Sequence, residues 1–205
     1  ATLTSCNEFL DMTPTNSISD KSIWTDVTTA EYSVNYLYSY IYDVMANQCV
    51  AGETESLTDQ LKYGSYNYNA LCFIPSEIAY GGNNLTANYV DIYLGYWGKW
   101  YEAIRRTNQE LSSLLKYGTL SETDAIRLQA EMRFIRAYLY FDLVKRYKEV
   151  IIYNEDLTAI TENKALSTEE EGWNFIQQDL EYAAVNLPEA KDANGRVNRG
   201  QAWAF

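Results

Sequence analysis

The sequence contains no histidine, so it lacks the side chain most often used for proton transfer near neutral pH. It also lacks a Gly-x-Ser-x-Gly motif and a glycine-rich phosphate loop. Zinc sites need histidine or clustered cysteines, and residues 192–195 begin like a calcium loop but lack its closing glutamate. We therefore expect no catalytic residue, no metal site and no cofactor, although two carboxylates could still form a glycoside hydrolase site.

Positive charge is also scarce. The 16 Lys and Arg residues stand against 28 Asp and Glu residues, for a formal net charge of −12. A nucleic-acid-binding protein needs a basic surface to displace counterions from phosphate, and docking onto anionic lipid needs one too. No apolar run reaches the roughly 18–20 residues that cross a bilayer. We expect no nucleic acid partner and no transmembrane helix.

Cysteine is rare, and the three present cannot all pair with one another. The string Leu3-Thr4-Ser5-Cys6 resembles the cleavage box of bacterial lipoproteins, in which the cysteine becomes the lipidated first residue. This predicts lipidation of Cys6, and residues 1–29 are interpreted as a leader remnant followed by an extended N-terminal segment. Cys49 and Cys72 could form a disulfide in an oxidising compartment or remain buried thiols.

Aromatic residues, in contrast, are abundant, with 19 tyrosines and 5 tryptophans. Over about 47–96, glycine and proline interrupt any helical period, while tyrosines stay frequent among Asn and Asp. A long irregular connection is often functional, and a flat ring beside an amide or carboxylate suits the apolar face and hydroxyl edge of a sugar. The candidate ligand-binding residues of this insert are Asp59, Tyr63, Tyr66, Tyr68, Tyr80, Asn83 and Asn84. Each tyrosine could instead pack the loop onto the helices.

Apolar residues recur at helical spacing in the rest of the chain. Helices are predicted over about 30–46, 89–117, 122–147 and 168–186, with a further helix that starts near Arg199. Asp26 or Thr28 is expected to cap the first helix, Gly118 to end the second, and Ser121 to cap the third. The Asn194-Gly195 pair predicts a turn.

The helix over 122–147 has the most regular pattern. Its predicted core stripe consists of Ala130, Phe134, Ala137, Phe141 and Val144. Arg127, Arg133 and Arg136 fall among the outer positions, and Arg133 and Arg136 are expected to pair with surface carboxylates. Residues 150–152 predict a short buried strand or an extended exit.

Aromatic residues on the other helices are interpreted as packing residues rather than ligand contacts. They are Trp97 and Trp100 in the second helix, Trp173 on the inner face of the fourth, and Tyr32, Tyr36, Tyr38, Tyr40 and Tyr42 in the first.

The order Ala130-x-x-x-Phe134-x-x-Ala137 is typical of the second helix of a tetratricopeptide repeat, where small residues allow a neighbour to approach closely. The predicted fold class is mainly all-α, with tetratricopeptide-like helical pairs and irregular loop inserts. An ordinary helical bundle is the alternative.

Five motifs, in order along the chain, resemble the SusD/RagB family of outer-membrane nutrient-binding lipoproteins. They are Cys6-Asn7-Glu8-Phe9-Leu10-Asp11 with Pro14, Trp97-x-x-x-Tyr101-x-x-Ile104-x-x-x-Asn108, Ala130-Glu131-x-Arg133-Phe134-x-Arg136-Ala137-x-x-Tyr140-Phe141-x-Leu143-Val144, Asp179-Leu180-x-x-Ala183 with Leu187-Pro188, and Gly195-Arg196-Val197-x-x-Gly200-x-Ala202. The family commonly has Tyr-Gly-x-Val-Pro where this chain has Tyr147-Lys148-Glu149-Val150-Ile151, so this turn is expected to differ locally.

The resemblance implies that residues 30–205 form a SusD-like N-terminal helical-repeat domain, with the insert at about 47–96, and that the chain is truncated at its C-terminus. It further implies a non-catalytic, surface-exposed lipoprotein of Bacteroidota-type bacteria, held at the outer membrane by the lipid on Cys6 alone. Such a protein captures oligosaccharide and delivers it to a SusC-like TonB-dependent transporter. Peptide cargo on the same architecture is one alternative, and a two-carboxylate glycoside hydrolase is another.

Overall fold

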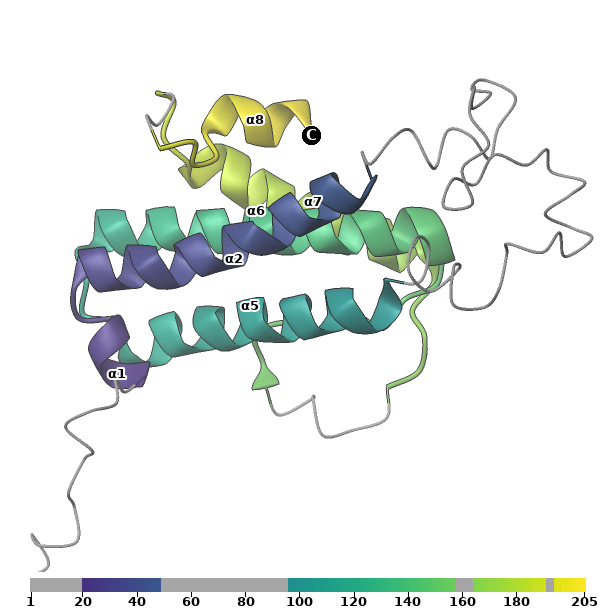
Figure 1. Cartoon of the computed structure of the whole chain (residues 1–205), viewed down its shortest axis with the longest axis horizontal. Coiled ribbons are helices and arrows are strands. Elements are labelled where there is room, and N and C mark those ends of the chain that lie inside the picture. Colours follow the sequence, from purple (N-terminus) through teal and green to yellow (C-terminus); the bar gives the residue numbers. More distant parts are fainter. Residues whose placement is uncertain (1–19, 49–95, 158–163, 191–193) are drawn as a thin grey trace, which may run out of the picture.

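A computed structural model describes residues 20–48, 96–157, 164–190 and 194–205. The helices in these ranges (Figure 1) are α1 (Asp20–Ile23), α2 (Val27–Gln48), α5 (Trp97–Tyr117), α6 (Glu122–Tyr147), α7 (Glu169–Asn186) and α8 (Arg199–Ala204). An isolated antiparallel bridge joins Val150 to Ser167. The predicted mainly α class is confirmed, and residues 150–152 form an extended exit from α6 rather than a strand in a sheet.

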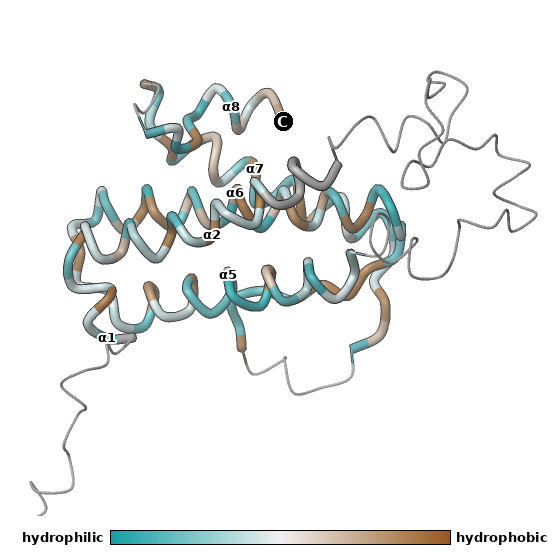
Figure 2. The backbone as a smooth tube through the Cα atoms, in the orientation of Figure 1, coloured by the Kyte–Doolittle hydropathy of each residue, from teal (hydrophilic) through white to brown (hydrophobic). Residues whose placement is uncertain are grey.

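The central helix of the fold is α6, against which α2, α5 and α7 all pack. Successive helices from α5 to α8 alternate in direction, as antiparallel pairs do (Figure 1). Hydrophobic and hydrophilic positions alternate along α2, α5 and α6 (Figure 2). The fully buried side chains of α6 include Leu128, Met132, Ile135, Leu139 and Leu143. Each such aliphatic side chain contributes on the order of 1.5–3 kcal/mol by its burial.

The caps of three helices follow from the sequence. Asp26, one of two predicted caps of α2, accepts a hydrogen bond from the backbone N–H of Thr29 at 3.0 Å. Ser121 caps α6 as predicted, because its hydroxyl accepts a hydrogen bond from the backbone N–H of Asp124 at 3.1 Å. Thr168 and Glu171 form a reciprocal capping box at the start of α7. A cap of this kind stabilises its helix by about 1 kcal/mol.

The C-terminal end of α5 depends on a glycine. Gly118 ends α5 as predicted, in an extended conformation with φ −63° and ψ 130°. A Cβ on this residue would lie 2.5 Å from the Leu114 carbonyl oxygen, so the close approach itself requires glycine.

The end of α6 is a strained turn at Lys148, the position where the family pattern has glycine. Lys148 has φ 63° and ψ −68°, and the Glu149 N–H donates to the Tyr147 carbonyl at 2.8 Å. This three-residue turn with positive φ is the rare, strained form of the γ-turn. The departure in sequence therefore leaves a side chain on a backbone conformation that favours glycine.

Arg136 corrects the prediction that the arginines of α6 take outer positions, because its side chain is 1% exposed. Glu131 and Asp142, on the same helix, are equally buried. Three neighbouring helices pack against α6, so most of its polar face is shielded from solvent. The predicted pairing of Arg133 and Arg136 with carboxylates is confirmed, although the Asp179 partner of Arg136 is buried rather than on the surface. Arg127 pairs with a carboxylate as well.

Several aromatic residues predicted to pack in the core or at an interface are exposed on this chain and are not part of its core. On α2, Tyr32, Tyr36 and Tyr42 are 69%, 57% and 72% exposed. The core contacts of this helix come mainly from Ala30, Val34 and Leu37. On α7, Trp173 is 37% exposed although an inward position was predicted. Trp100, in contrast, is fully buried as expected, with its Nε1–H donating to Asp142 at 2.6 Å.

The lead-in before α2 was predicted to be irregular, yet residues 20–23 form α1. Trp24 follows it and is fully buried, and its carbonyl accepts from the Thr119 N–H at 3.0 Å. The gap between Trp24 and Thr119 in sequence shows that this turn is held by tertiary contacts. In the described ranges, no helix is long and apolar enough to cross a membrane.

Candidate functional site

The extended exit after α6 is held by two tyrosine hydroxyls instead of a neighbouring strand. Tyr101 of α5 donates its hydroxyl proton to the Ile151 carbonyl at 3.0 Å and accepts from the Ile151 N–H at 2.6 Å. Tyr140 of α6 accepts from the Tyr153 N–H at 2.8 Å and lies 3.2 Å from the carbonyls of Ile151 and Tyr153. These hydroxyls satisfy the backbone groups that a β ladder would otherwise pair.

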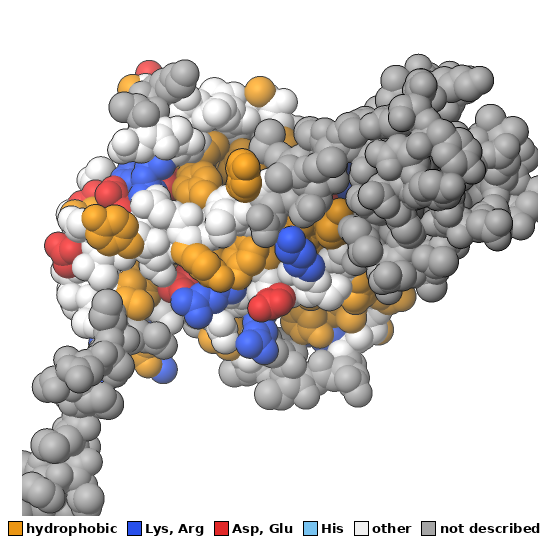
Figure 3. Space-filling view, viewed as in Figure 1, with side chains coloured by type: hydrophobic (Ala, Val, Ile, Leu, Met, Phe, Trp, Pro, Cys, Tyr) orange, Lys and Arg blue, Asp and Glu red, His pale blue; other side chains and the backbone are white. Residues whose placement is uncertain are grey.

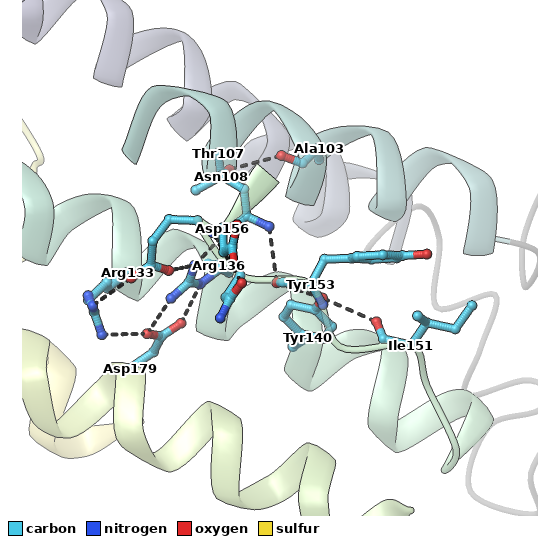
Figure 4. A network of polar contacts seen from close by, with 12 residues as sticks. Ala103, Thr107, Asn108, Arg133, Arg136, Tyr140, Ile151, Tyr153, Asp156 and Asp179 are labelled. Atoms are coloured by element: carbon cyan, nitrogen blue, oxygen red, sulfur yellow. Dashed lines mark hydrogen bonds and ion pairs between the residues drawn. The ribbon is translucent and has the colours of Figure 1, made fainter. Parts of the chain in front are cut away.

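A buried polar network around Arg136 joins three helices to the same segment (Figure 4). Its guanidinium donates to both carboxylate oxygens of Asp179, at 2.7 and 2.8 Å, and to Asn108 and Glu155 at 2.7 Å each. Asn108 in turn donates to the Tyr153 carbonyl at 3.0 Å. Arg136 and Asp179 are each 1% exposed, and two-pronged pairing of this kind fixes geometry as well as charge.

The ionisation of these groups follows from their surroundings. Burial opposes the charged form of Arg136, but the hydrogen bonds and charges of Asp179 and Glu155 raise its pKa above the ordinary value. Burial likewise works against ionised Glu155, yet the Arg136 charge lowers the pKa of that carboxyl. Burial raises the pKa of Tyr101 to about 12 and also raises that of Tyr140, so both keep the proton that they donate.

The extended segment held in this way forms part of the lining of a pocket of about 280 Å³ beside α5. The lining residues are Trp97, Tyr101, Arg105, Ile151 and Tyr153. The ring centroids of Trp97 and Tyr101 are 4.8 Å apart. Those of Tyr101 and Tyr153 are 6.2 Å apart with the planes at 87°. Three rings and a guanidinium thus surround one hollow.

A second pocket of about 350 Å³ lies between α2 and α5 and shares Arg105 with the first. Its other lining residues are Tyr36, Tyr40, Glu102, Arg106 and Gln109. Hydrophobic side chains, a class that includes tyrosine, lie over α2 and α5 with charged side chains among them (Figure 3). We call the two pockets together the α5 groove.

The row Trp97, Tyr101, Arg105 and Gln109 repeats every four residues, which places its members along one side of α5. Twelve residues at 1.5 Å each make this row about 18 Å long. Along this row two rings are followed by a guanidinium and an amide, so flat apolar contact at one end adjoins planar hydrogen bonding at the other. This composition suits a short oligosaccharide, whose rings have apolar faces and hydroxyl edges.

Two other pockets lie in the described part of the chain. The one of about 420 Å³ between α7 and α8 is lined by aromatic side chains, among them Trp173, Trp203 and Phe205, together with Gln177 and Glu181, so its composition also suits a sugar. In the one of about 460 Å³ beside Arg196, that guanidinium is already bonded to Glu131 and Asn35.

The residues predicted to bind ligand lie outside the described residues. They are Asp59, Tyr63, Tyr66, Tyr68, Tyr80, Asn83 and Asn84. The predicted lipid acceptor Cys6 and the cysteines at 49 and 72 also lie outside. Sequence reasoning missed the α5 groove, although the four-residue repeat of Trp97, Tyr101 and Arg105 was a readable signal. Within the described ranges, no group of three or more acidic or cysteine side chains could hold a metal ion.

The comparison with known protein families matches residues 8–205 to the SusD-like family described as "Starch-binding associating with outer membrane". The chain belongs to the SusD-like family. The residues that carried the resemblance in sequence now have structural roles, since Asn108, Arg136 and Asp179 meet in one buried network. The motifs also supply Trp97 and Tyr101 of the groove, whereas the groove residues Arg105 and Tyr153 lie outside them.

A SusD-like protein of Bacteroides ovatus is 26% identical over 203 residues, a match that covers 97% of this chain and 34% of that protein. A SusD-like protein of Formosa agariphila is 23% identical over 216 residues, covering 98% of this chain and 38% of its own length. This chain therefore spans about a third of the length of the curated relatives it matches.

Among solved structures, a SusD-like protein from Bacteroides fragilis is similar with a TM-score of 0.63 and 25% identity, covering 94% of this chain and 36% of that one. The predicted fold of tetratricopeptide-like helical pairs is confirmed by this likeness.

Proposed function

We propose that this protein is a non-catalytic, surface-exposed glycan-binding lipoprotein that captures oligosaccharide for uptake. The family is described as starch-binding and outer-membrane-associated, which supports both the ligand class and the location. The observation that carries the proposal is the α5 groove, where Trp97, Tyr101 and Tyr153 surround one pocket and Tyr36 and Tyr40 line the next.

Delivery to a SusC-like TonB-dependent outer-membrane transporter and lipid attachment at Cys6 belong to the same proposal. The string Leu3-Thr4-Ser5-Cys6 supports the lipid attachment, and stable anchoring takes more than one acyl chain. The thioether and amide positions of an N-terminal cysteine supply such chains together. Mass spectrometry of the protein isolated from membranes tests this, since an unmodified Cys6 would refute the anchor.

The groove is tested with calorimetric titration of the full-length protein against a panel of plant and algal oligosaccharides. Replacing Tyr36 or Tyr153 by Ala is expected to lower affinity about tenfold or more, because truncating an aromatic anchor costs over 1 kcal/mol. Tyr32→Ala is the matched control for Tyr36→Ala, because both tyrosines are exposed on α2 and Tyr32 lies outside the groove.

The ligand would bind elsewhere than in the α5 groove if all three variants, Tyr36→Ala, Tyr153→Ala and Tyr32→Ala, had equal affinities for it. Binding of basic peptides in place of sugars would favour peptide cargo on the same architecture. Release of new reducing ends during incubation of polysaccharide with the pure protein would instead indicate a hydrolase.

A further inference from the structure

We propose that the α5 groove is selective for an acidic oligosaccharide and that Arg105 binds the carboxylate or sulfate of its sugar. This inference rests on the proposed function, because it names the substrate class of the same groove. Its starting point is the position of Arg105, which lines both pockets. A ligand that occupies the whole groove must pass this guanidinium.

Arg105 is an available cation. Its side chain is exposed, and no carboxylate in the described part of the chain pairs with it. Three arginines of α6 are different, because Arg127, Arg133 and Arg136 each contact at least two carboxylates. Because Arg105 lies between the two pockets and pairs with no carboxylate among the described residues, its guanidinium is open to an external anion.

The lining of the groove carries more positive than negative side chains, whereas the whole chain has a net negative charge. The lining contains Arg105 and Arg106 against Glu102. Lys164 adds a cation at the far end, with its ammonium 5.4 Å from the centre of the Tyr153 ring. Arg106 is partly neutralised by Glu110 at 2.7 Å, which leaves Arg105 as the main anion partner.

The shape of the groove fits an acidic sugar within a chain rather than a free anion. A guanidinium matches a carboxylate or sulfate with two parallel hydrogen bonds, while the rings on either side of Arg105 contact neighbouring sugar faces. A free inorganic anion would gain the first interaction but none of the stacking. Affinity should therefore need both the charge and the oligosaccharide chain.

The test uses calorimetric titration of the full-length protein with four ligands: oligogalacturonate, its fully methyl-esterified form, a sulfated galactan oligosaccharide and inorganic sulfate. Esterification removes the charge and keeps the sugar chain. We expect at least one of the two acidic oligosaccharides to bind at least tenfold more tightly than the neutral ester, and sulfate alone not to saturate. The preference should shrink as salt rises from 50 to 500 mM, where screening is stronger.

Arg105→Gln is expected to reduce the ratio of acidic to neutral affinity at least tenfold. Lys116→Gln is the matched control, because it removes one positive charge from an exposed position on the same helix outside the groove. Circular dichroism checks that both variants fold.

The outcomes separate this inference from the proposed function. Binding of the neutral ester as tightly as the acidic chains, or an unchanged ratio in Arg105→Gln, overturns the acidic selectivity while glycan binding stands. Absence of binding to every oligosaccharide overturns both. A loss in Lys116→Gln equal to that in Arg105→Gln would show general charge attraction and refute the role of Arg105.

Discussion

Replacing Lys148 by glycine should stabilise the protein, because this residue holds a γ-turn with φ 63°. A Cβ in a left-handed conformation costs about 1–2 kcal/mol, and glycine removes that cost. Glycine in turn loses about 0.5–1 kcal/mol more than alanine through its freer unfolded chain. The difference between the midpoints of these two costs predicts that Lys148→Gly is more stable than Lys148→Ala by about 0.75 kcal/mol.

Lys148→Ala is the proper reference because both variants lose the same ion pair. The Lys148 ammonium lies 3.7 Å from Glu169, with side chains 74% and 46% exposed, and such a surface pair contributes little. Urea denaturation followed by far-UV circular dichroism at 25 °C measures the two unfolding free energies. If Lys148→Gly were no more stable than Lys148→Ala, the turn would not be strained at its Cβ and the reasoning would fail.

Three further predictions concern the packing of α6. Asp179→Ala should lower the free energy of unfolding by about 3 kcal/mol, because it leaves the buried Arg136 without its two-pronged partner. The contact between Arg136 and Glu155 remains, so the loss should lie near the lower end of the range for a broken buried pair. Gly172→Leu should cost about 1–3 kcal/mol, since even a Cβ there would lie 2.8 Å from Val144. Because Arg136 lowers the pKa of Glu155, this carboxylate stabilises the fold at neutral pH, and the contribution should be lost as pH falls below its ordinary value of 4.5.

Each of these has a matched control in urea denaturation. Glu189→Gln breaks the exposed pair with Arg199, 80% and 37% exposed, and should cost under about 0.5 kcal/mol; an equal loss in Asp179→Ala would contradict the buried-pair argument. Gly200→Leu tests an exposed helical glycine and should be less harmful than Gly172→Leu. Glu155→Gln should flatten the acid limb of the stability curve, so an unchanged limb would show that Glu155 does not contribute to it.

Local signals made most of the helices predictable. The bounds of α6 are those read from its apolar period, and α7 differs only because Thr168 is its cap rather than its first residue. Caps at Asp26 and Ser121 depend on side chains within three residues of the atoms that they bind. The short helix α1 was missed because it has no apolar period of its own and depends on the burial of Trp24.

The buried polar contacts of α6 could not be predicted from local sequence in the same way. A period of 3.6 residues places Arg136 opposite the apolar stripe, but it cannot show that neighbouring helices also cover that side. The partners Asn108 and Asp179 lie 28 and 43 residues away along the chain. The groove likewise depends on Tyr153, whose place beside Tyr101 is fixed by backbone contacts to side chains of two helices.

The hydroxyls of Tyr101 and Tyr140 give an unusual meaning to a conservative substitution. Phenylalanine at position 101 would keep the ring but remove the hydroxyl that accepts from the Ile151 amide and donates to its carbonyl, so that only the Tyr140 hydroxyl would remain beside that carbonyl. Two phenolic oxygen atoms, together with Asn108, thus hold the stretch of main chain that lines one side of the pocket at Tyr153.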